Sequence, residues 1–231
     1  MLNNTNPRRN MQALLFLLCC IFIPAIASAH ALGVDLTKLS RTEVGWVYLR
    51  LGYKHILDLP GGLDHILFIL CIYLLNPKLK TVIAQATAFT VAHSITLGLA
   101  MYGVIHPPAS IIEPVIALSI FFVAVENMLT DKLKPTRLLI VFAFGLIHGM
   151  GFASTLTGLG LPQKEFVTGL ISFNVGVELG QISIILMAWA LIGIAFSKKE
   201  WYGKRVVMPL SGIIAAIALF WTIERTFFTT Y

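Results

Sequence analysis

The chain has 231 residues, of which 57% are hydrophobic and 12% are charged, and its formal net charge is +6. So few charged side chains cannot cover a water-facing surface, which excludes a soluble globular protein and predicts a membrane protein. The positive charge is expected to orient the chain in a bilayer and not to bind nucleic acid.

Residues 1–29 predict a cleavable signal peptide. Arg8 and Arg9 precede the apolar run "MQALLFLLCCIFIPAIA", and the small residues of 27–29 follow in the pattern of a cleavage site. Cleavage after residue 29 would leave His30 at the new N-terminus, whereas cleavage after Ala31 would remove it. An uncleaved additional helix is the alternative. After cleavage, Cys71 is the only cysteine that remains, which excludes a disulfide framework.

Residues 30–62 are expected to form a short extracytoplasmic segment. Its stretch "TEVGWVYLRLGYKHIL" is amphipathic and is predicted to lie on the membrane surface. The following Pro60, Gly61 and Gly62 favour a turn that directs the chain into the bilayer.

Residues 63–231 predict a transmembrane domain of six helices. A helix needs about 20 mainly apolar residues to cross the hydrocarbon core. Six such stretches follow one another: 64–77, 80–103, 112–129, 137–157, 166–196 and 206–225. The predicted fold class is therefore an all-α integral membrane protein with a six-helix bundle.

The basic residues predict the orientation of this bundle, because short cytoplasmic loops are enriched in Lys and Arg. The connection after the fifth span holds Lys198, Lys199, Lys204 and Arg205. The connections after the first and third spans hold Lys78, Lys80, Lys132, Lys134 and Arg137. The connections on the other side hold little more than Lys164. The mature N- and C-termini are therefore expected on the outer side of a bacterial inner membrane.

A weak internal echo links the second and fourth spans. The pattern Ala-Phe-x-x-x-His ends at His93 and recurs ending at His148, and Val-x-Val-Glu ends at Glu126 and again at Glu178. Spans two and four run in the same direction in the predicted topology. The echo would then be a parallel repeat of a helix pair, although short apolar patterns also recur by chance.

Polar side chains at membrane depth are the main functional signal. An acidic side chain at the bilayer centre costs roughly 2.5–3.5 kcal/mol, so several must be paired, protonated, metal-bound or in contact with water. Every predicted span except the last carries such residues: Asp64, His65, His93, Glu113, Glu126, Asn127, His148, Asn174, Glu178 and Gln181. The spacing of Asn174, Glu178 and Gln181 puts all three on one helical face.

Each of these residues also has a structural interpretation. His93 and His148 could be hydrogen-bonding links between helices, and Asn174 and Gln181 have that supporting role by default. Glu113 could stabilise a helix start before Pro114. Glu126 and Asn127 could cap the inner end of their helix beside Lys132.

Five motifs resemble the HupE/UreJ family of membrane proteins, which are associated with hydrogenase and urease and regarded as nickel or cobalt permeases. The motifs are "GGLDHILFIL", "TAFTVAHSITLGLA", "EPVIALSIFFVAVEN", "FGLIHGMGFA" and "FNVGVELGQ", within residues 50–195. The resemblance implies that Asp64 and His65 belong to a metal-selective motif with an upstream histidine. Eight residues separate His55 from Asp64, more than is usual in the family. Either His55 reaches the site through a longer loop or it no longer takes part.

These observations predict a permease for a divalent transition-metal ion, because imidazole, carboxylate and amide ligands suit Ni²⁺, Co²⁺, Zn²⁺ or Fe²⁺. Asp64 and His65 are expected to recruit the ion, with His55, Asp58 and Glu113 as further candidates. A second station is expected from His93, His148 and Glu178, and an inner exit at Glu126. No ATP-binding motif occurs, so an ion gradient or intracellular trapping must supply the energy.

Three other functions remain open at this point. The chain could be an accessory or metal-sensing protein that acts with metalloenzyme maturation proteins. It could be an intramembrane zinc hydrolase, or a haem protein with His93 and His148 as axial ligands. We expect no enzymatic activity and no permanently bound cofactor. The expected partners are the lipid bilayer, the metal ion and metalloenzyme maturation proteins.

Overall fold

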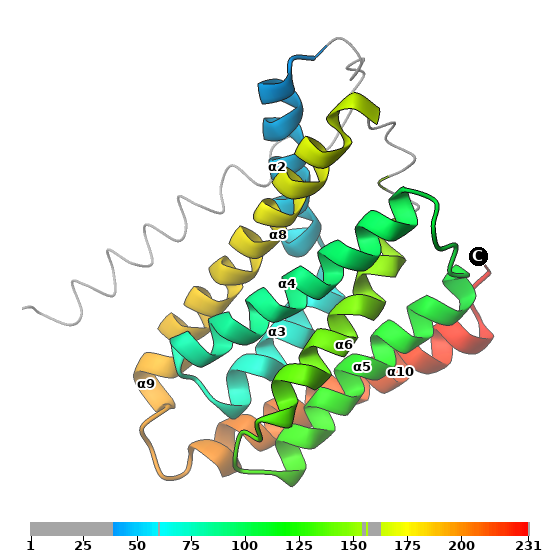
Figure 1. Cartoon of the computed structure of the whole chain (residues 1–231). Coiled ribbons are helices and arrows are strands. Elements are labelled where there is room, and N and C mark those ends of the chain that lie inside the picture. The colour runs from blue at the N-terminus through cyan, green and yellow to red at the C-terminus, as the bar shows by residue number, and fades with distance from the viewer. Residues whose placement is uncertain (1–38, 60, 154–155, 157–162, 231) are drawn as a thin grey trace, which may run out of the picture.

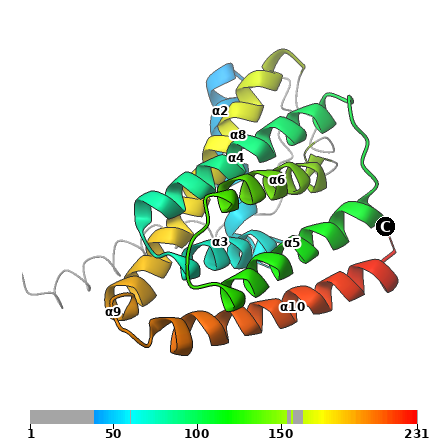
Figure 2. The same cartoon turned by 60° about the horizontal axis from the view of Figure 1, so that its bottom comes forward.

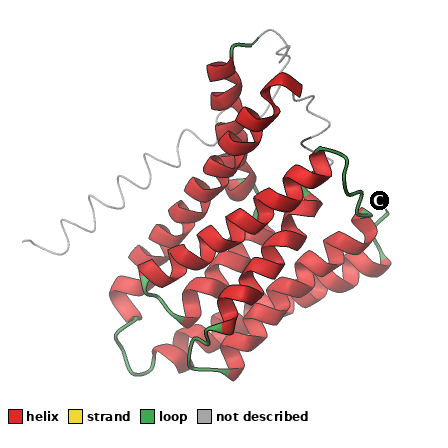
Figure 3. Cartoon of the chain, viewed as in Figure 1, coloured by secondary structure: helices red, strands yellow, loops and turns green. Residues whose placement is uncertain are grey.

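The computed structural model describes residues 39–59, 61–153, 156 and 163–230, and every regular element in these ranges is a helix (Figure 3). The all-α class is therefore confirmed. The predicted signal peptide and His30 lie outside the described residues. The main helices are α2 (Arg41–Leu57), α3 (Leu63–Leu75), α4 (Leu79–Met101), α5 (Ala109–Leu129), α6 (Thr136–Gly151), α8 (Phe166–Ala188) and α10 (Met208–Phe227). Short elements flank the last two: η3 (Gln163–Glu165), η4 (Trp189–Gly193), α9 (Ile194–Phe196) and η5 (Gly203–Val207).

Four helical stretches are long and apolar enough to cross a membrane: α4, α5, Phe166–Phe196 and Gly203–Phe227. The other two predicted spans are shorter, since α3 has 13 residues and α6 has 16. At 1.5 Å per residue they extend about 20 Å and about 24 Å, less than the hydrocarbon thickness of about 30 Å. The prediction of six full-length spans is thus confirmed for four of them.

The short helix α3 lies at the centre of the bundle. It contacts α2, α4, α5, α8 and α10 (Figure 1). Seven of its 13 residues are buried, including Phe68, Ile72 and Tyr73. This environment explains why its sequence "LDHILFILCIYLL" is apolar on all sides.

Helix α2 packs against the bundle along α8, although the sequence suggested a helix lying on the membrane surface. Its buried residues Val44, Tyr48, Gly52 and Ile56 form one stripe with a spacing of four. A Cβ atom on Gly52 would lie 3.1 Å from the Cα of Phe173 and closer still to its carbonyl group. The absence of side chains at such glycines allows the two backbones to approach, which is how helices associate in lipid.

The order of these contacts shows that α2 and α8 run in the same direction. The N-terminal half of α2 meets the N-terminal half of α8 at Gly45 and Ser172, and their later halves meet at Ile56 and Gly180. The chain therefore descends through α2, turns at 58–62, and continues in α3 to the far end of the bundle (Figure 1). Together, α2 and α3 form one passage of the chain through the bundle, which is interrupted at the turn between the two helices.

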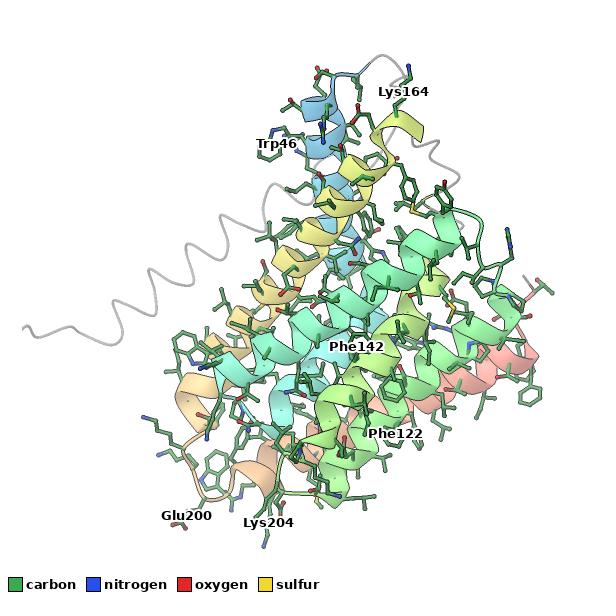
Figure 4. All side chains as sticks on the ribbon, viewed as in Figure 1. Trp46, Phe122, Phe142, Lys164, Glu200 and Lys204 are labelled. Atoms are coloured by element: carbon green, nitrogen blue, oxygen red, sulfur yellow. The ribbon has the colours of Figure 1, made fainter. Side chains whose placement is uncertain are left out.

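The connections predicted to be cytoplasmic lie at one end of the bundle. Glu200 and Lys204 lie at this end, and Lys164 lies at the opposite end (Figure 4). The loop before α6 shares the end of Lys204 (Figure 1). Helices α5 and α10 lie side by side and antiparallel, which brings the C-terminal end of α10 beside the connection between α4 and α5 (Figure 2). The grouping of the connections agrees with the predicted topology, whereas the side of the membrane that each end faces stays a prediction.

The two helices that carry the echoed pattern pack in parallel. A Cβ atom on Gly145 of α6 would lie 2.6 Å from the carbonyl oxygen of Phe89 in α4. One turn later, Gly149 lies against the backbone of His93. The predicted common direction of these two helices is confirmed, and the absence of side chains at Gly145 and Gly149 lets their backbones approach closely.

Candidate metal site

Three histidines from three helices converge where the α2–α3 passage breaks. His55 lies in the last turn of α2, His65 in the first turn of α3, and His93 in the middle of α4. One nitrogen from each lies within 4.8 Å of the others. This is the only group of three or more potential metal ligands of this compactness among the described residues.

The turn between the helices returns the chain toward the bundle and so places His55 beside His65. The backbone N–H of Gly62 donates to the carbonyl of Asp58 at 2.7 Å. A Cβ atom on Gly62 would lie 2.5 Å from the carbonyl oxygen of Ile56, so only glycine fits there. The imidazole rings of His55 and His65 have centroids 4.7 Å apart. The longer spacer therefore brings His55 into the cluster.

Several imidazole nitrogens of the cluster are buried without a hydrogen-bond partner among the described residues. They are Nε2 of His55, both nitrogens of His65, and Nε2 of His93. His65 and His93 are 6% and 0% exposed, respectively. A buried polar group left unpaired costs about 1–3 kcal/mol, so several together indicate a site for a ligand.

The neighbours of His93 leave one of its nitrogens available for metal. Its Nδ1 lies 3.4 Å from Oδ1 of Asn174. The amide nitrogen of Asn174 donates to the carbonyl of Leu170 at 2.8 Å, so its oxygen is the atom that faces the histidine. Nδ1 of His93 must then carry the proton, and Nε2 has the lone pair that a metal requires.

His148 is a fourth imidazole next to the cluster, with its ring centroid 5.4 Å from that of His65. Ser119 donates its hydroxyl proton to the carbonyl of Ile116 at 2.7 Å and accepts from Nε2 of His148 at 2.9 Å. The lone pair of His148 is therefore on Nδ1, which is buried without a partner among the described residues. His148 is therefore a further potential ligand beside the three histidines.

Aromatic rings enclose the imidazoles. Phe152 lies 3.8 Å from His55 between ring centroids, and Phe89 lies 5.0 Å from His148. Phe68 and Phe173 complete the wall. This apolar surrounding limits the access of water to the imidazoles and sets the dielectric around an ion bound there.

A cavity of about 460 Å³ adjoins the histidines. It lies at the turn where α2 and α3 meet. Besides three of the histidines, its lining contains four charged side chains: Lys54, Asp58, Asp64 and Glu113. Asp58, Asp64 and Glu113, which were predicted to help recruit the ion, therefore line the same cavity as His55, His65 and His148.

Arg225 of α10 pairs with the carboxylates of this cavity, and the sequence analysis did not identify it. Its guanidinium donates to both oxygens of Asp64 at 2.9 and 3.0 Å. It also lies 3.4 Å from Oε2 of Glu113. The expectation that the last span lacks an ionisable residue at the site is therefore wrong. The sequence feature that could have identified Arg225 is its position as a charged residue at the end of the apolar stretch 206–225.

Glu178 does not lie with the histidines, contrary to the predicted station of His93, His148 and Glu178. Its Oε1 accepts a hydrogen bond of 2.6 Å from Thr87 of α4. Further along the same interface, Thr90 donates to Gln181 at 3.2 Å. Asn174, Glu178 and Gln181 thus share the predicted face, which is directed at α4, but the antiparallel course of α4 and α8 moves Glu178 away from the cluster.

Glu126 is also remote from the histidines, because it pairs with Arg137 of α6 at 2.9 Å. Arg137 is 1% exposed and donates to Oδ1 of Asn127 at 2.9 Å. Asn127 in turn donates to the carbonyl of Cys71 at 2.8 Å. This network joins α3, α5 and α6 near the basic end of the bundle, the end at which the Lys- and Arg-rich connections lie. It agrees with the structural interpretation of Glu126 and Asn127.

Ser119 and Arg137 were not identified from the sequence as functional or linking residues. Ser119 is one hydroxyl in an apolar span, a common feature without a distinctive pattern. Arg137 was counted only among the basic residues of the connection after the third span. Both roles depend on which helices become neighbours.

The comparison with protein families gives one match. The model of the family described as HupE / UreJ protein matches residues 32–225. Searches of curated proteins and of solved structures give no significant match.

Proposed function

The chain belongs to the HupE/UreJ family, and we propose that it is a membrane permease for a divalent transition-metal ion, nickel or cobalt in the first place. The observation that carries this proposal is the cluster of His55, His65 and His93, whose ligand atoms lie within 4.8 Å of one another. Imidazole is a preferred ligand of Ni²⁺, Co²⁺ and Zn²⁺, whereas Mg²⁺ and Ca²⁺ prefer oxygen. Metal–nitrogen bonds of about 2.0–2.1 Å require nitrogens somewhat closer than these. Small side-chain rotations would close the cluster on an ion.

The site suits transport because it combines few ligands with an open approach. Three neutral imidazoles, with His148 as an optional fourth, hold a divalent ion less firmly than a set that includes thiolates would. An ion must be able to leave a transport site as well as enter it. The adjoining cavity of about 460 Å³, at the turn between α2 and α3, provides the entry.

Polar side chains continue from the histidines toward the end of the bundle that carries Lys204 (Figure 4). Thr90, Gln181 and Glu178 follow His93 along the interface of α4 and α8. A second cavity of about 330 Å³ lies at the basic end, lined by Gln85, Lys134 and other residues. We propose that the ion leaves along this interface, with Glu178 as a station beyond the histidines. We place the protein in a bacterial inner membrane with both mature termini outside, driven by an ion gradient or by intracellular trapping.

A zinc hydrolase is the second candidate, because three histidine ligands with an open position are also typical of catalytic zinc. Such an enzyme needs a carboxylate or another base next to the metal-bound water. Asp58, Asp64 and Glu113 line the adjoining cavity, and Asp64 and Glu113 are paired with Arg225. The permease is therefore the better proposal. An accessory or sensing role would use the same ion site without flux.

Uptake into proteoliposomes that contain this protein alone tests the proposal. Radioactive Ni²⁺, Co²⁺ and Zn²⁺ are supplied outside, and the internal label is measured over time. We expect uptake by the wild type and its loss in His55→Gln, His65→Gln and His93→Gln. His106→Gln is the matched control, because His106 is exposed in the connection after α4 and does not belong to the cluster.

Three outcomes separate the candidates. Saturable uptake that needs all three histidines supports a permease. Ion binding without uptake favours an accessory or sensing protein. A tightly retained Zn²⁺ with hydrolysis of an ester or peptide substrate would favour the enzyme, and normal uptake by His93→Gln would refute the assignment of the site.

A further inference from the structure

The cavity beside the histidines contains more negative groups than a nitrogen-only metal site requires. Asp58, Asp64 and Glu113 line it together with His55 and His65. Carboxylates are the ligands that Mg²⁺, Ca²⁺ and Mn²⁺ prefer. Unpaired, this group of acids would attract those abundant ions to the entrance of the site.

Arg225 is placed to prevent this. Its two terminal nitrogens hold both oxygens of Asp64 at 2.9 and 3.0 Å, in the paired geometry that makes arginine–carboxylate contacts strong. The same guanidinium contacts the carboxylate of Glu113 at 3.4 Å and its backbone carbonyl at 3.3 Å. One fixed cation therefore contacts two of the three acids.

The ring of Trp221 keeps Arg225 in position. Trp221 precedes Arg225 by four residues, one helical turn, and its ring centroid lies 5.3 Å from the guanidinium carbon. Arg225 is 19% exposed and Asp64 is 14% exposed, so solvent weakens their attraction only in part. The arrangement is therefore a stable feature of the cavity and not a mobile surface pair.

We propose that Arg225 determines ion selectivity by occupying Asp64 and Glu113, which leaves the neutral imidazoles as the ligands available to an entering ion. This inference rests on the proposed function of the histidine cluster. Arg225 acts on the ion through the carboxylates and touches neither the ion nor the histidines in this role. Ions that prefer nitrogen can still bind, whereas ions that prefer oxygen find their ligands already paired.

The test is equilibrium binding of radioactive Ni²⁺ and Mn²⁺ to the purified full chain in detergent. We expect Arg225→Gln to raise the affinity for Mn²⁺ by about tenfold or more, the effect of losing one nearby charge pair in a partly solvated site. Its affinity for Ni²⁺ should change much less. Adding Asp64→Asn and Glu113→Gln to that variant should return Mn²⁺ binding to the wild-type level.

Two control variants separate pairing from general electrostatics. Lys54→Gln removes a positive charge from the same cavity, but Lys54 has no carboxylate partner among the described residues. It should raise the affinities for Ni²⁺ and Mn²⁺ by similar factors and leave their ratio unchanged. Arg225→Lys keeps the charge and should keep most of the selectivity.

The possible results have distinct meanings. Unchanged Mn²⁺ binding in a folded Arg225→Gln variant overturns the inference, and the proposed function survives if Ni²⁺ binding is intact. Gain of Mn²⁺ binding with no Ni²⁺ binding in the wild type supports the role of Arg225 and overturns the proposed function. If Arg225→Gln does not fold, the double variant Asp64→Asn/Arg225→Gln leaves Glu113 as the released acid, and it should show a smaller gain of Mn²⁺ affinity.

Discussion

Asn174 should control the metal affinity of the site although it is not a ligand. Its side-chain oxygen faces Nδ1 of His93 at 3.4 Å and so keeps the lone pair of that histidine on Nε2. Asn174→Leu removes this acceptor but preserves the approximate volume of the side chain. His93 would then adopt both neutral tautomers, and only one of them can bind the ion at Nε2.

The size of the effect follows from the geometry. Loss of a residue that orients a metal-bound histidine usually lowers affinity by about 10–100-fold. The distance of 3.4 Å is long for a hydrogen bond, so we expect the lower end, about tenfold or about 1.4 kcal/mol. Asn174→Asp retains an acceptor and should bind Ni²⁺ at least as tightly as the wild type.

Equilibrium binding of radioactive Ni²⁺, with thermal unfolding as a check on the fold, measures this effect. Gln181→Leu is the matched control, because Gln181 lies on the same face of α8 and contacts Thr90 instead of a histidine. It should leave Ni²⁺ affinity unchanged. Equal losses in the Asn174 and Gln181 variants, or wild-type affinity in Asn174→Leu, would refute the argument that Asn174 fixes the tautomer.

Further perturbations test the packing and the pH response. Gly149→Ala should separate α6 from α4 at His93 and reduce Ni²⁺ affinity by tenfold or more, whereas Gly61→Ala, which meets nothing within 4 Å, should have no effect in the same binding assay. Glu126→Gln leaves the buried Arg137 without its carboxylate and should destabilise the protein by about 3–5 kcal/mol, measurable as a lower denaturation midpoint. Uptake should fall as the external pH is lowered, because protons compete with the ion for imidazole, and uptake that rises on acidification would contradict this.

The sequence predicted the features that depend on residue type and on regular spacing. Hydrophobicity alone identified the helical membrane class, and i, i+4, i+7 spacing placed Asn174, Glu178 and Gln181 on one face. The recurring Ala-Phe-x-x-x-His pattern and the predicted topology gave α4 and α6 a common direction, which their contacts confirm. His65 and His93 were selected because a histidine in lipid is costly, and that argument needs no knowledge of the fold.

The features that sequence reasoning missed depend on contacts between distant segments. His55 joins the cluster because a turn at Gly62 brings the end of α2 back to α3, and the spacing alone left two alternatives for it. Arg225 reaches Asp64 across 161 positions of the chain. The loop charges were counted for topology only, so an arginine at the end of a span received no role. Helix α2 was assigned to the surface because its partner face on α8 could not be identified from the sequence.

The ends of the short helices give an independent reason why the cavity should hold a cation. The last turn of α2 contributes His55 to the cavity, and the residue after this helix contributes Asp58. The C-terminal end of α6 contributes Gly151 and Phe152 to the same cavity. Helices α3 and α5 begin near it, with Asp64 and Glu113 in their first two turns, and α10 ends near it with Arg225 in its last turn. Each helix C-terminus carries about half a negative charge and each N-terminus about half a positive charge, so three ends of the first kind outweigh two of the second.

Asp64 lies in the first turn of α3, where the positive end of that helix favours its carboxylate. The same positive end would otherwise oppose an entering metal ion. With Asp64 there, and with Arg225 balancing it, the remaining backbone field from α2 and α6 is directed at the imidazoles. In membrane transporters the C-terminal ends of interrupted helices recur as cation-binding elements, and the ends of α2 and α6 at this cavity fit that use.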